Sequence, residues 1–218
     1  MNLSDTKTII FDYDGTIHNS FELYKNALLM VFDELVEKGL KNYPAPNDEV
    51  IKSYLGMNPL EMWNDFGEGL PEDVKKESSK KIGQLMGELL LQGKASLYPN
   101  ALKTLNYLKK QGYHLVFLSN CTQRYMENHT RLFTLNSLFD VMINAEMYDY
   151  LPKKDILTKV KHNLLSPMVM IGDRFHDIEA GKANNLYTIG CSYGFGNQDE
   201  LKESDLQIKS IEELLNYF

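Results

Sequence analysis

Short apolar runs alternate with helix-like stretches over most of this chain. The runs that read as buried strands cover residues 8–11, 114–118, 141–143, 168–171 and 188–191. Stretches with apolar residues at helical spacing cover 101–111, 124–133, 155–163, 178–184 and 211–217. Buried strands that alternate with helices in this way are typical of a parallel sheet with helices on both faces.

The segment from about residue 19 to residue 92 has a different pattern. It contains no strand-like run, and its apolar residues recur at helical spacing. The predicted helices are 21–40, 47–55, 59–66 and 71–91. Because this segment lies between the first strand and the next α/β unit, we expect an inserted helical domain. The predicted boundaries are 1–17 and 93–218 for the α/β core domain, and 18–92 for the insertion.

Composition and charge argue against several other classes of protein. Apolar residues make up 43% of the 218 positions, which is enough for a sizeable core. The net charge of -7 argues against a broad basic face for nucleic acid. No run approaches the roughly 20 apolar residues of a membrane-spanning helix, and no signal-peptide pattern is recognised. The two cysteines lack metal-ligand spacing, so we expect reduced thiols in a cytoplasmic protein.

Two acidic segments follow predicted strands. Asp12 and Asp14 come directly after the strand 8–11 and are two residues apart, so both carboxylates can face one site. Asp173 follows the predicted strand 168–171, and Asp177 lies one helical turn further along. These carboxylates and a backbone carbonyl near Asp14 suit Mg²⁺, which prefers oxygen ligands. Considered separately, the first segment also fits a turn, and Asp177 fits a helix N-terminal acid.

Two further segments could handle phosphate. The hydroxyl of Ser119 and the backbone N–H groups after it follow the strand 114–118 and could hold phosphoryl oxygens, although Ser119-Asn120 also fits a helix N-cap region. Lys153 or Lys154, just before a predicted helix, could offset the charge of carboxylates and phosphate, or form an exposed basic pair. Ligands of open α/β sheets gather at the carboxyl ends of the strands, so the four segments together predict one phosphate-handling site.

Together these segments resemble the four motifs of the haloacid dehalogenase superfamily of phosphohydrolases, and the phosphoglycolate phosphatase-like members in particular. The resemblance covers nearly the whole chain, and its motifs are 11–16 (Phe-Asp-Tyr-Asp-Gly-Thr), 118–120, the lysine at 153 and 172–177. It implies a Rossmann-like doubly wound parallel sheet core with an inserted all-helical cap domain of the first type. The loop 56–59 is a candidate for a cap loop that reaches the site, or else a plain connection between helices.

The resemblance also implies a role for each residue. Asp12 attacks phosphorus and forms an aspartyl-phosphate, while Asp14 acts as general acid and then as general base. The phosphate-binding residues are Ser119, Asn120 and Lys153, with Lys154 as an alternative because the usual proline after the lysine is absent. The Mg²⁺ ligands are Asp12, Asp173 and the carbonyl of Asp14, with Asp177 in support.

The function implied in this way is a Mg²⁺-dependent phosphatase that hydrolyses phosphomonoesters of small metabolites. The alternatives are a phosphosugar mutase that resembles β-phosphoglucomutase, and a non-catalytic phosphate-sensing protein. Lys52 is the only basic residue placed to bind a second phosphate just before Gly56, which favours hydrolysis over the mutase. We expect a small phosphorylated metabolite as the partner, no nucleic acid or membrane, and a monomer or homodimer.

Three residues depart from the family pattern or stand out near it. Tyr13 replaces a small or aliphatic residue, and its backbone N–H is expected to matter more than its ring. His18 lies in a run where many relatives have Val-Asp-Ser, and we expect it on the surface of the hinge, with contact to substrate as the alternative. Cys121, two residues after Ser119, is interpreted as a quiet buried thiol, with oxidation sensitivity as the alternative.

Overall fold

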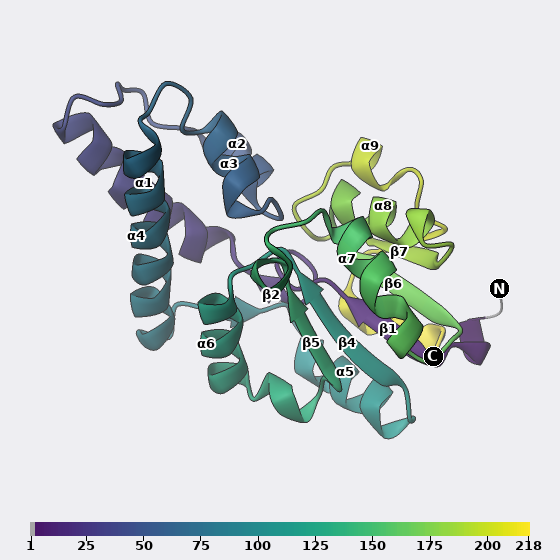
Figure 1. Cartoon of the computed structure of the whole chain (residues 1–218). Helices are drawn as coiled ribbons and strands as arrows, with labels where there is room; N and C mark the ends of the chain where they lie inside the picture. Colours follow the sequence, from purple (N-terminus) through teal and green to yellow (C-terminus); the bar gives the residue numbers. More distant parts are fainter. Residues whose placement is uncertain (1–2) are drawn as a thin grey trace. The chain divides into compact units, whose positions relative to one another are not determined.

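The computed structural model describes residues 3–218, which form two compact units (Figure 1). The first unit contains the chain up to Asn19 together with Leu97–Phe218, and the second contains Ser20–Ser96. Two short strands, β2 (His18–Asn19) and β3 (Ser96–Leu97), pair with each other where the chain passes between the units.

The first unit is built on a six-stranded sheet in the order β5-β4-β1-β6-β7-β8, and its paired neighbours are parallel. The strands are β1 (Thr8–Phe11), β4 (His114–Ser119), β5 (Val141–Asn144), β6 (Met168–Gly172), β7 (Tyr187–Cys191) and β8 (Leu206–Ile208). The chain adds strands first on one side of β1 and then on the other. This is a doubly wound sheet, as predicted, and its topological switch lies at β1.

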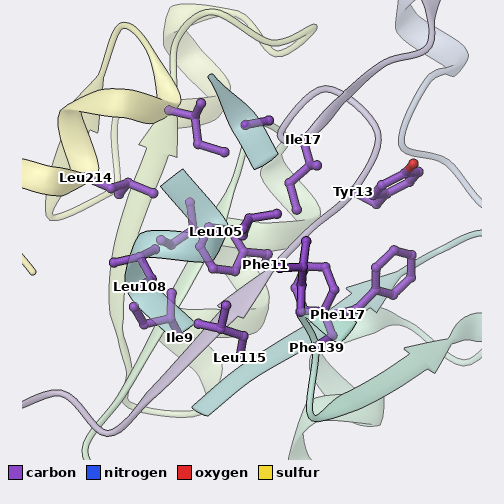
Figure 2. Close-up of a cluster of buried hydrophobic side chains, with 14 of the residues drawn as sticks. Ile9, Phe11, Tyr13, Ile17, Leu105, Leu108, Leu115, Phe117, Phe139 and Leu214 are labelled. Atoms are coloured by element: carbon purple, nitrogen blue, oxygen red, sulfur yellow. The ribbon is translucent and has the colours of Figure 1, made fainter. Parts of the chain in front are cut away.

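Helices cover both faces of this sheet, and a hydrophobic core lies on each face. The helices are α5 (Ala101–Lys110), α6 (Gln123–Phe133), α7 (Lys153–Val160), α8 (Phe175–Ala183) and α9 (Gln198–Leu201). Because side chains alternate along a strand, Ile9 and Phe11 enter one core with Leu105 of α5 (Figure 2). Ile10 enters the other core with Ile156 of α7. The central strand is thus buried on both faces, which explains its uninterrupted apolar sequence.

The second unit is helical. Its helices are α1 (Phe21–Glu37), α2 (Asp48–Tyr54), α3 (Pro59–Asp65) and α4 (Glu72–Leu91), and α1 packs against α4. The Asn47 side chain caps α2, and Asn58 forms a capping box with Glu61 at the start of α3. In the loop 56–59, the Asn58 side chain therefore serves the start of a helix. Among residues 3–218, no helix has the length and apolar character to cross a membrane.

The structure differs from the sequence prediction mainly near the C-terminus. Strand β8 and helix α9 were not predicted, because three or four residues are too few to show a periodicity. The closing segment Ile211–Asn216 is a 3₁₀-helix rather than the predicted α-helix. Helices α7 and α8 begin before their predicted starts, at Lys153 and Phe175. These earlier starts place Lys153 and Asp177 in first helical turns.

Candidate active site

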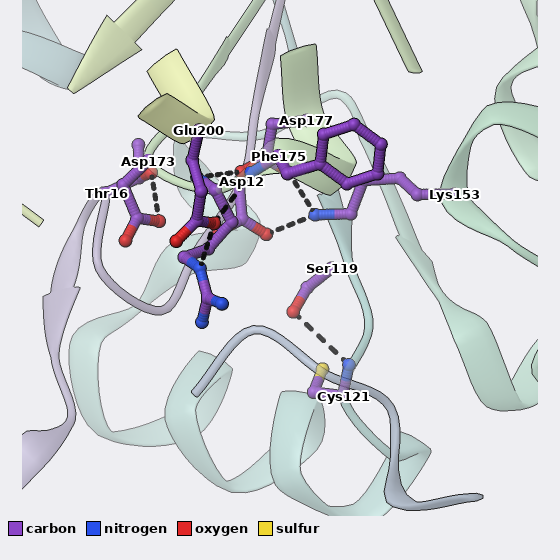
Figure 3. Close-up of polar contacts among 10 residues, drawn as sticks. Asp12, Thr16, Ser119, Cys121, Lys153, Asp173, Phe175, Asp177 and Glu200 are labelled. Atoms are coloured by element: carbon purple, nitrogen blue, oxygen red, sulfur yellow. Dashed lines mark hydrogen bonds and ion pairs between the residues drawn. The ribbon is translucent and has the colours of Figure 1, made fainter. Parts of the chain in front are cut away.

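The polar segments predicted from the sequence meet at the carboxyl ends of β1, β4 and β6, which are neighbours in the sheet (Figure 3). Asp12 follows β1, Ser119 is the last residue of β4, and Asp173 follows β6. Lys153 enters from the first turn of α7. Parallel strands end at one edge of a sheet, so residues far apart in the sequence become neighbours there.

Three carboxylates form the acidic centre of this site. Asp12, Asp173 and Asp177 are buried, and each offers an oxygen within 4.8 Å of the others. Burial, followed by repulsion from Asp177, raises the pKa of Asp12 well above its ordinary value. The same causes, in the same order, raise the pKa of Asp173 to about 7. The cluster therefore favours a cation, because positive charge would stabilise its ionised form.

Lys153 is the lysine that reaches this cluster. Its Nζ lies 2.6 Å from Asp12 Oδ1 and 2.5 Å from Asp177 Oδ1. Although burial by itself lowers the pKa of Lys153, the charges of Asp12 and Asp177 outweigh it, so the pKa is raised. Lys154 instead pairs with Glu179 at 2.7 Å. Of the two lysines left open by the sequence, the structure brings only Lys153 to the carboxylates.

Asp173 is held by backbone that fits closely around it. Its Oδ1 accepts a hydrogen bond from Thr16 Oγ1 at 3.3 Å, and its Oδ2 accepts one from the Phe195 N–H at 2.7 Å. A Cβ at Gly194 would lie 2.3 Å from Asp173 Cβ and 2.5 Å from the Gly15 carbonyl oxygen, which excludes a side chain there. The close approach of this backbone fixes the orientation of the carboxylate.

Asp177 serves the start of α8 and the acidic cluster at the same time. Its Oδ2 accepts a hydrogen bond from the Arg174 N–H at 2.9 Å, while Oδ1 faces Lys153. The Arg174 side chain is tied to α9 through Nε and Glu200 Oε2, 2.8 Å apart. The structure confirms that Asp177 serves the start of a helix, and its second oxygen is directed to the acidic cluster rather than to the helix.

Asp14 lies in a separate hydrogen-bonded group. Its Oδ1 is 2.9 Å from His18 Nδ1 and 2.5 Å from the Tyr125 hydroxyl. Burial by itself raises the pKa of Asp14, but the hydrogen bonds with His18 and Tyr125 outweigh it, and the pKa is lowered. The expectation of a surface histidine is wrong, because the His18 side chain is fully buried.

Tyr13, Tyr125 and His129 were not predicted as parts of this group. The Tyr13 ring, for which no contact was predicted, is buried, and its hydroxyl lies 2.9 Å from His129 Nδ1. Burial lowers the pKa of His129 to about 3, followed by repulsion from His18, so the ring is neutral. The sequence hints at this group only through the four-residue spacing of Tyr125 and His129, which places them on one face of α6.

Ser119 and Asn120 are both buried at the end of β4. Ser119 Oγ accepts a hydrogen bond from the Cys121 N–H at 3.3 Å (Figure 3). Desolvation raises the pKa of the Cys121 thiol, which favours the less reactive protonated form, but the residue is partly exposed rather than buried as predicted.

The raised pKa of Asp173 predicts a pH dependence for the metal-free protein. Its carboxyl ionises near pH 7 in the folded chain and near 3.8 in the unfolded chain, so the folded chain binds more protons between these values. The contribution of Asp173 to the free energy of unfolding is present in full below about pH 4 and is lost as pH rises to about 7. Urea unfolding in chelator should show this fall, and Asp173→Asn should reduce it. If the free energy of unfolding fell equally with pH in the wild-type protein and in Asp173→Asn, the pKa assigned to Asp173 would be contradicted.

The fold and the site define an α/β protein with a buried acidic cluster at its topological switch point. Residues 9–191 match the family described as haloacid dehalogenase-like hydrolase, and the chain belongs to that family. The predicted family and the prediction of a phosphatase-type enzyme are thereby confirmed.

Similar proteins span almost the full length of the chain. A phosphoglycolate phosphatase of Haemophilus influenzae is 27% identical and covers 91% of each chain. Pyrophosphatase PpaX of Halalkalibacterium halodurans is 22% identical, in an alignment that covers 97% of this chain and 96% of the pyrophosphatase. The crystal structure of a predicted phosphatase from Clostridium acetobutylicum has the same fold, with a TM-score of 0.80 at 22% identity over 97% of each chain.

Proposed function

We propose that the protein is a Mg²⁺-dependent phosphatase that hydrolyses phosphomonoesters of small metabolites through an aspartyl-phosphate on Asp12. The observation that carries the proposal is the single buried cluster in which Lys153 contacts Asp12 and Asp177, with Asp173 alongside. The phosphatase names of similar proteins support the reaction class. They do not identify one substrate, because a phosphoglycolate phosphatase and a pyrophosphatase are both among them.

The side chains of the cluster fit a magnesium ion. Asp12, Asp173 and Asp177 offer only oxygen atoms, as a hard divalent cation requires, and the Asp14 carbonyl is the proposed fourth protein ligand. Burial and repulsion from Asp177 raise the pKa of Asp12 and of Asp173, so a bound cation would stabilise their ionised forms. Bound Mg²⁺ would neutralise charge and orient the phosphoryl oxygens.

The proposed reaction has two steps at phosphorus. A carboxylate oxygen of Asp12 forms a bond to phosphorus as the bond to the ester oxygen breaks, and Asp14 gives the ester oxygen a proton. The pKa of Asp14 is lowered in the free protein, and the negative charge of a bound phosphate would raise it and so favour the protonated form. Water then attacks phosphorus, Asp14 takes its proton, and the bond to Asp12 breaks. In both steps Lys153 orients the Asp12 carboxylate, to which its Nζ donates a hydrogen bond of 2.6 Å. Ser119, Asn120 and Lys153 are the proposed phosphate-binding residues.

We assign the helical unit Ser20–Ser96 the role of a cap domain. Exclusion of water during the first step would protect the ester from direct attack by solvent and let Asp12 react first. The family resemblance supports this assignment, because the unit is inserted between the first strand and the rest of the sheet.

Release of inorganic phosphate from a panel of phosphorylated metabolites tests this function. We expect release with Mg²⁺, and none with excess chelator. The ranking of the panel would narrow the substrate. If wild-type protein with Mg²⁺ releases phosphate from no compound, the proposal fails, and isomerisation of sugar phosphates becomes the next activity to measure.

Asp14→Asn is expected to slow turnover strongly. The amide cannot donate or accept the required proton, and loss of general acid–base catalysis costs about 10²–10⁴-fold in kcat. Phosphate release at saturating substrate measures the effect. Release from this variant at the wild-type rate would remove Asp14 from the mechanism.

A further inference from the structure

Two polar side-chain atoms meet at one oxygen of Asp14. Asp14 Oδ1 lies 2.5 Å from the Tyr125 hydroxyl and 2.9 Å from His18 Nδ1. The Tyr125 hydroxyl and His18 Nδ1 are themselves 3.0 Å apart. Neither His18 nor Tyr125 belongs to the motifs that carry the family resemblance, so the reaction described above leaves this arrangement unexplained.

The surroundings of His18 determine where its proton lies. Its side chain is fully buried, and its Nε2 has no hydrogen-bond partner among residues 3–218. A proton on Nε2 would therefore be a buried donor without an acceptor, which is costly. A proton on Nδ1 instead has Asp14 Oδ1 as its acceptor, 2.9 Å away. Both His18 and Tyr125 can then donate to Asp14 Oδ1.

Packed aromatic rings hold both donors in place. The His18 ring stacks on Tyr13 with centroids 5.3 Å apart, and the Tyr125 ring stacks on His129 with centroids 4.1 Å apart. A hydrogen bond between the Tyr13 hydroxyl and His129 Nδ1, 2.9 Å long, joins the two pairs. The Gly15 N–H also donates to the His18 carbonyl at 2.9 Å, which closes the turn after Asp14. The donors therefore have little freedom to move.

The Asp14 carboxylate is less enclosed than its partners. Its side chain keeps 17% of its surface exposed, whereas that of His18 keeps none. An oxygen that accepts two hydrogen bonds is a poor place for a third proton. Oδ2 is then the oxygen left to carry a proton to the ester and to receive one from water.

We propose that His18 and Tyr125 are positioning residues, which fix the Asp14 carboxylate through Oδ1 and reserve Oδ2 for proton transfer. This inference rests on the proposed phosphatase function. General acid catalysis requires the proton to lie close to the leaving oxygen and to be aimed at it. A carboxyl group that can rotate would meet this condition for only part of the time.

The dependence of rate on the leaving group tests this role. Phenoxide needs a proton more than p-nitrophenoxide does, because it is the more basic leaving group. For phenyl phosphate and p-nitrophenyl phosphate, kcat/KM depends only on the steps up to and including cleavage of the ester bond. The ratio of the two values therefore reports proton donation, and a general loss of structure would lower both values together.

The variants are Tyr125→Phe and His18→Leu, each measured with Mg²⁺. We expect each to raise the preference for p-nitrophenyl phosphate by about tenfold, a fraction of the full general-acid effect. His18→Asn, whose amide can donate from near the Nδ1 position, should restore most of the wild-type ratio. Tyr187→Phe is the matched control, because it removes a hydroxyl that donates to the Asp205 carbonyl, away from Asp14. Thermal unfolding of each variant checks the fold.

An unchanged ratio in both Tyr125→Phe and His18→Leu would overturn the inference, even if their activity falls. The same ratio change in Tyr187→Phe would also overturn it. If wild-type protein releases no phosphate from either ester in a metal-dependent way, the proposed function itself fails, and the inference fails with it. The wild-type measurement separates these two failures.

Discussion

Asp12→Asn is expected to abolish turnover while the fold stays intact. The amide is almost the same size as the carboxylate and can still accept a hydrogen bond from Lys153, but it is not a nucleophile for phosphorus. Loss of an essential nucleophile lowers kcat on the order of 10⁶-fold. Phosphate release at saturating substrate with Mg²⁺ measures this loss, and thermal unfolding measures the fold.

Asp155→Asn is the matched control for that variant. Asp155 is an exposed acid in the first turn of α7, two residues from Lys153, and it is outside the buried cluster. Its loss should leave kcat close to the wild-type value. Retained activity in a well-folded Asp12→Asn protein would end the assignment of Asp12 as nucleophile.

Lys153→Met is expected to lower both activity and the stability of the metal-free protein. The change leaves Asp12, Asp173 and Asp177 buried without the ammonium group of Lys153. Loss of one partner of a buried ion pair costs about 3–5 kcal/mol. Activity should fall about 10²–10³-fold, as when a donor to the transition state is removed. Urea unfolding with and without Mg²⁺ measures the stability, and the metal should restore part of the loss.

Lys154→Met provides the comparison on the neighbouring residue. The Lys154 side chain pairs with Glu179 near the surface, so its removal should leave the free energy of unfolding and kcat almost unchanged. Equal free energies of unfolding for Lys153→Met and Lys154→Met in chelator would show that Lys153 does not stabilise the buried carboxylates.

The sequence predicted the parts of the molecule that depend on local pattern. Asp12, Ser119 and Asp173 each follow a continuous apolar run, and such runs proved to be neighbouring parallel strands. Their side chains therefore had to meet at one edge of the sheet. The choice between Lys153 and Lys154 stayed open, because it depends on where α7 begins, and helix ends are the least certain feature of a sequence pattern.

The parts that escaped prediction depend on contacts between distant segments. His18 appeared to be a hinge residue because nothing near it in the sequence shows that Tyr13 and α6 cover it. Tyr125 lies 111 residues from Asp14, and the sequence does not show that their side chains meet. Gly194 is similar, because its need to be glycine arises from Asp173 and Gly15 rather than from a turn of its own.

The most direct test of the mechanism is to locate the phosphoryl group during turnover. Protein mixed with p-nitrophenyl phosphate and Mg²⁺ is quenched in acid within the first turnover, and its intact and peptide masses are measured. The account predicts one added phosphoryl group on the peptide that contains Asp12, and none in Asp12→Asn. Phosphorylation of another residue, or a phosphorylated Asp12→Asn protein, would contradict it.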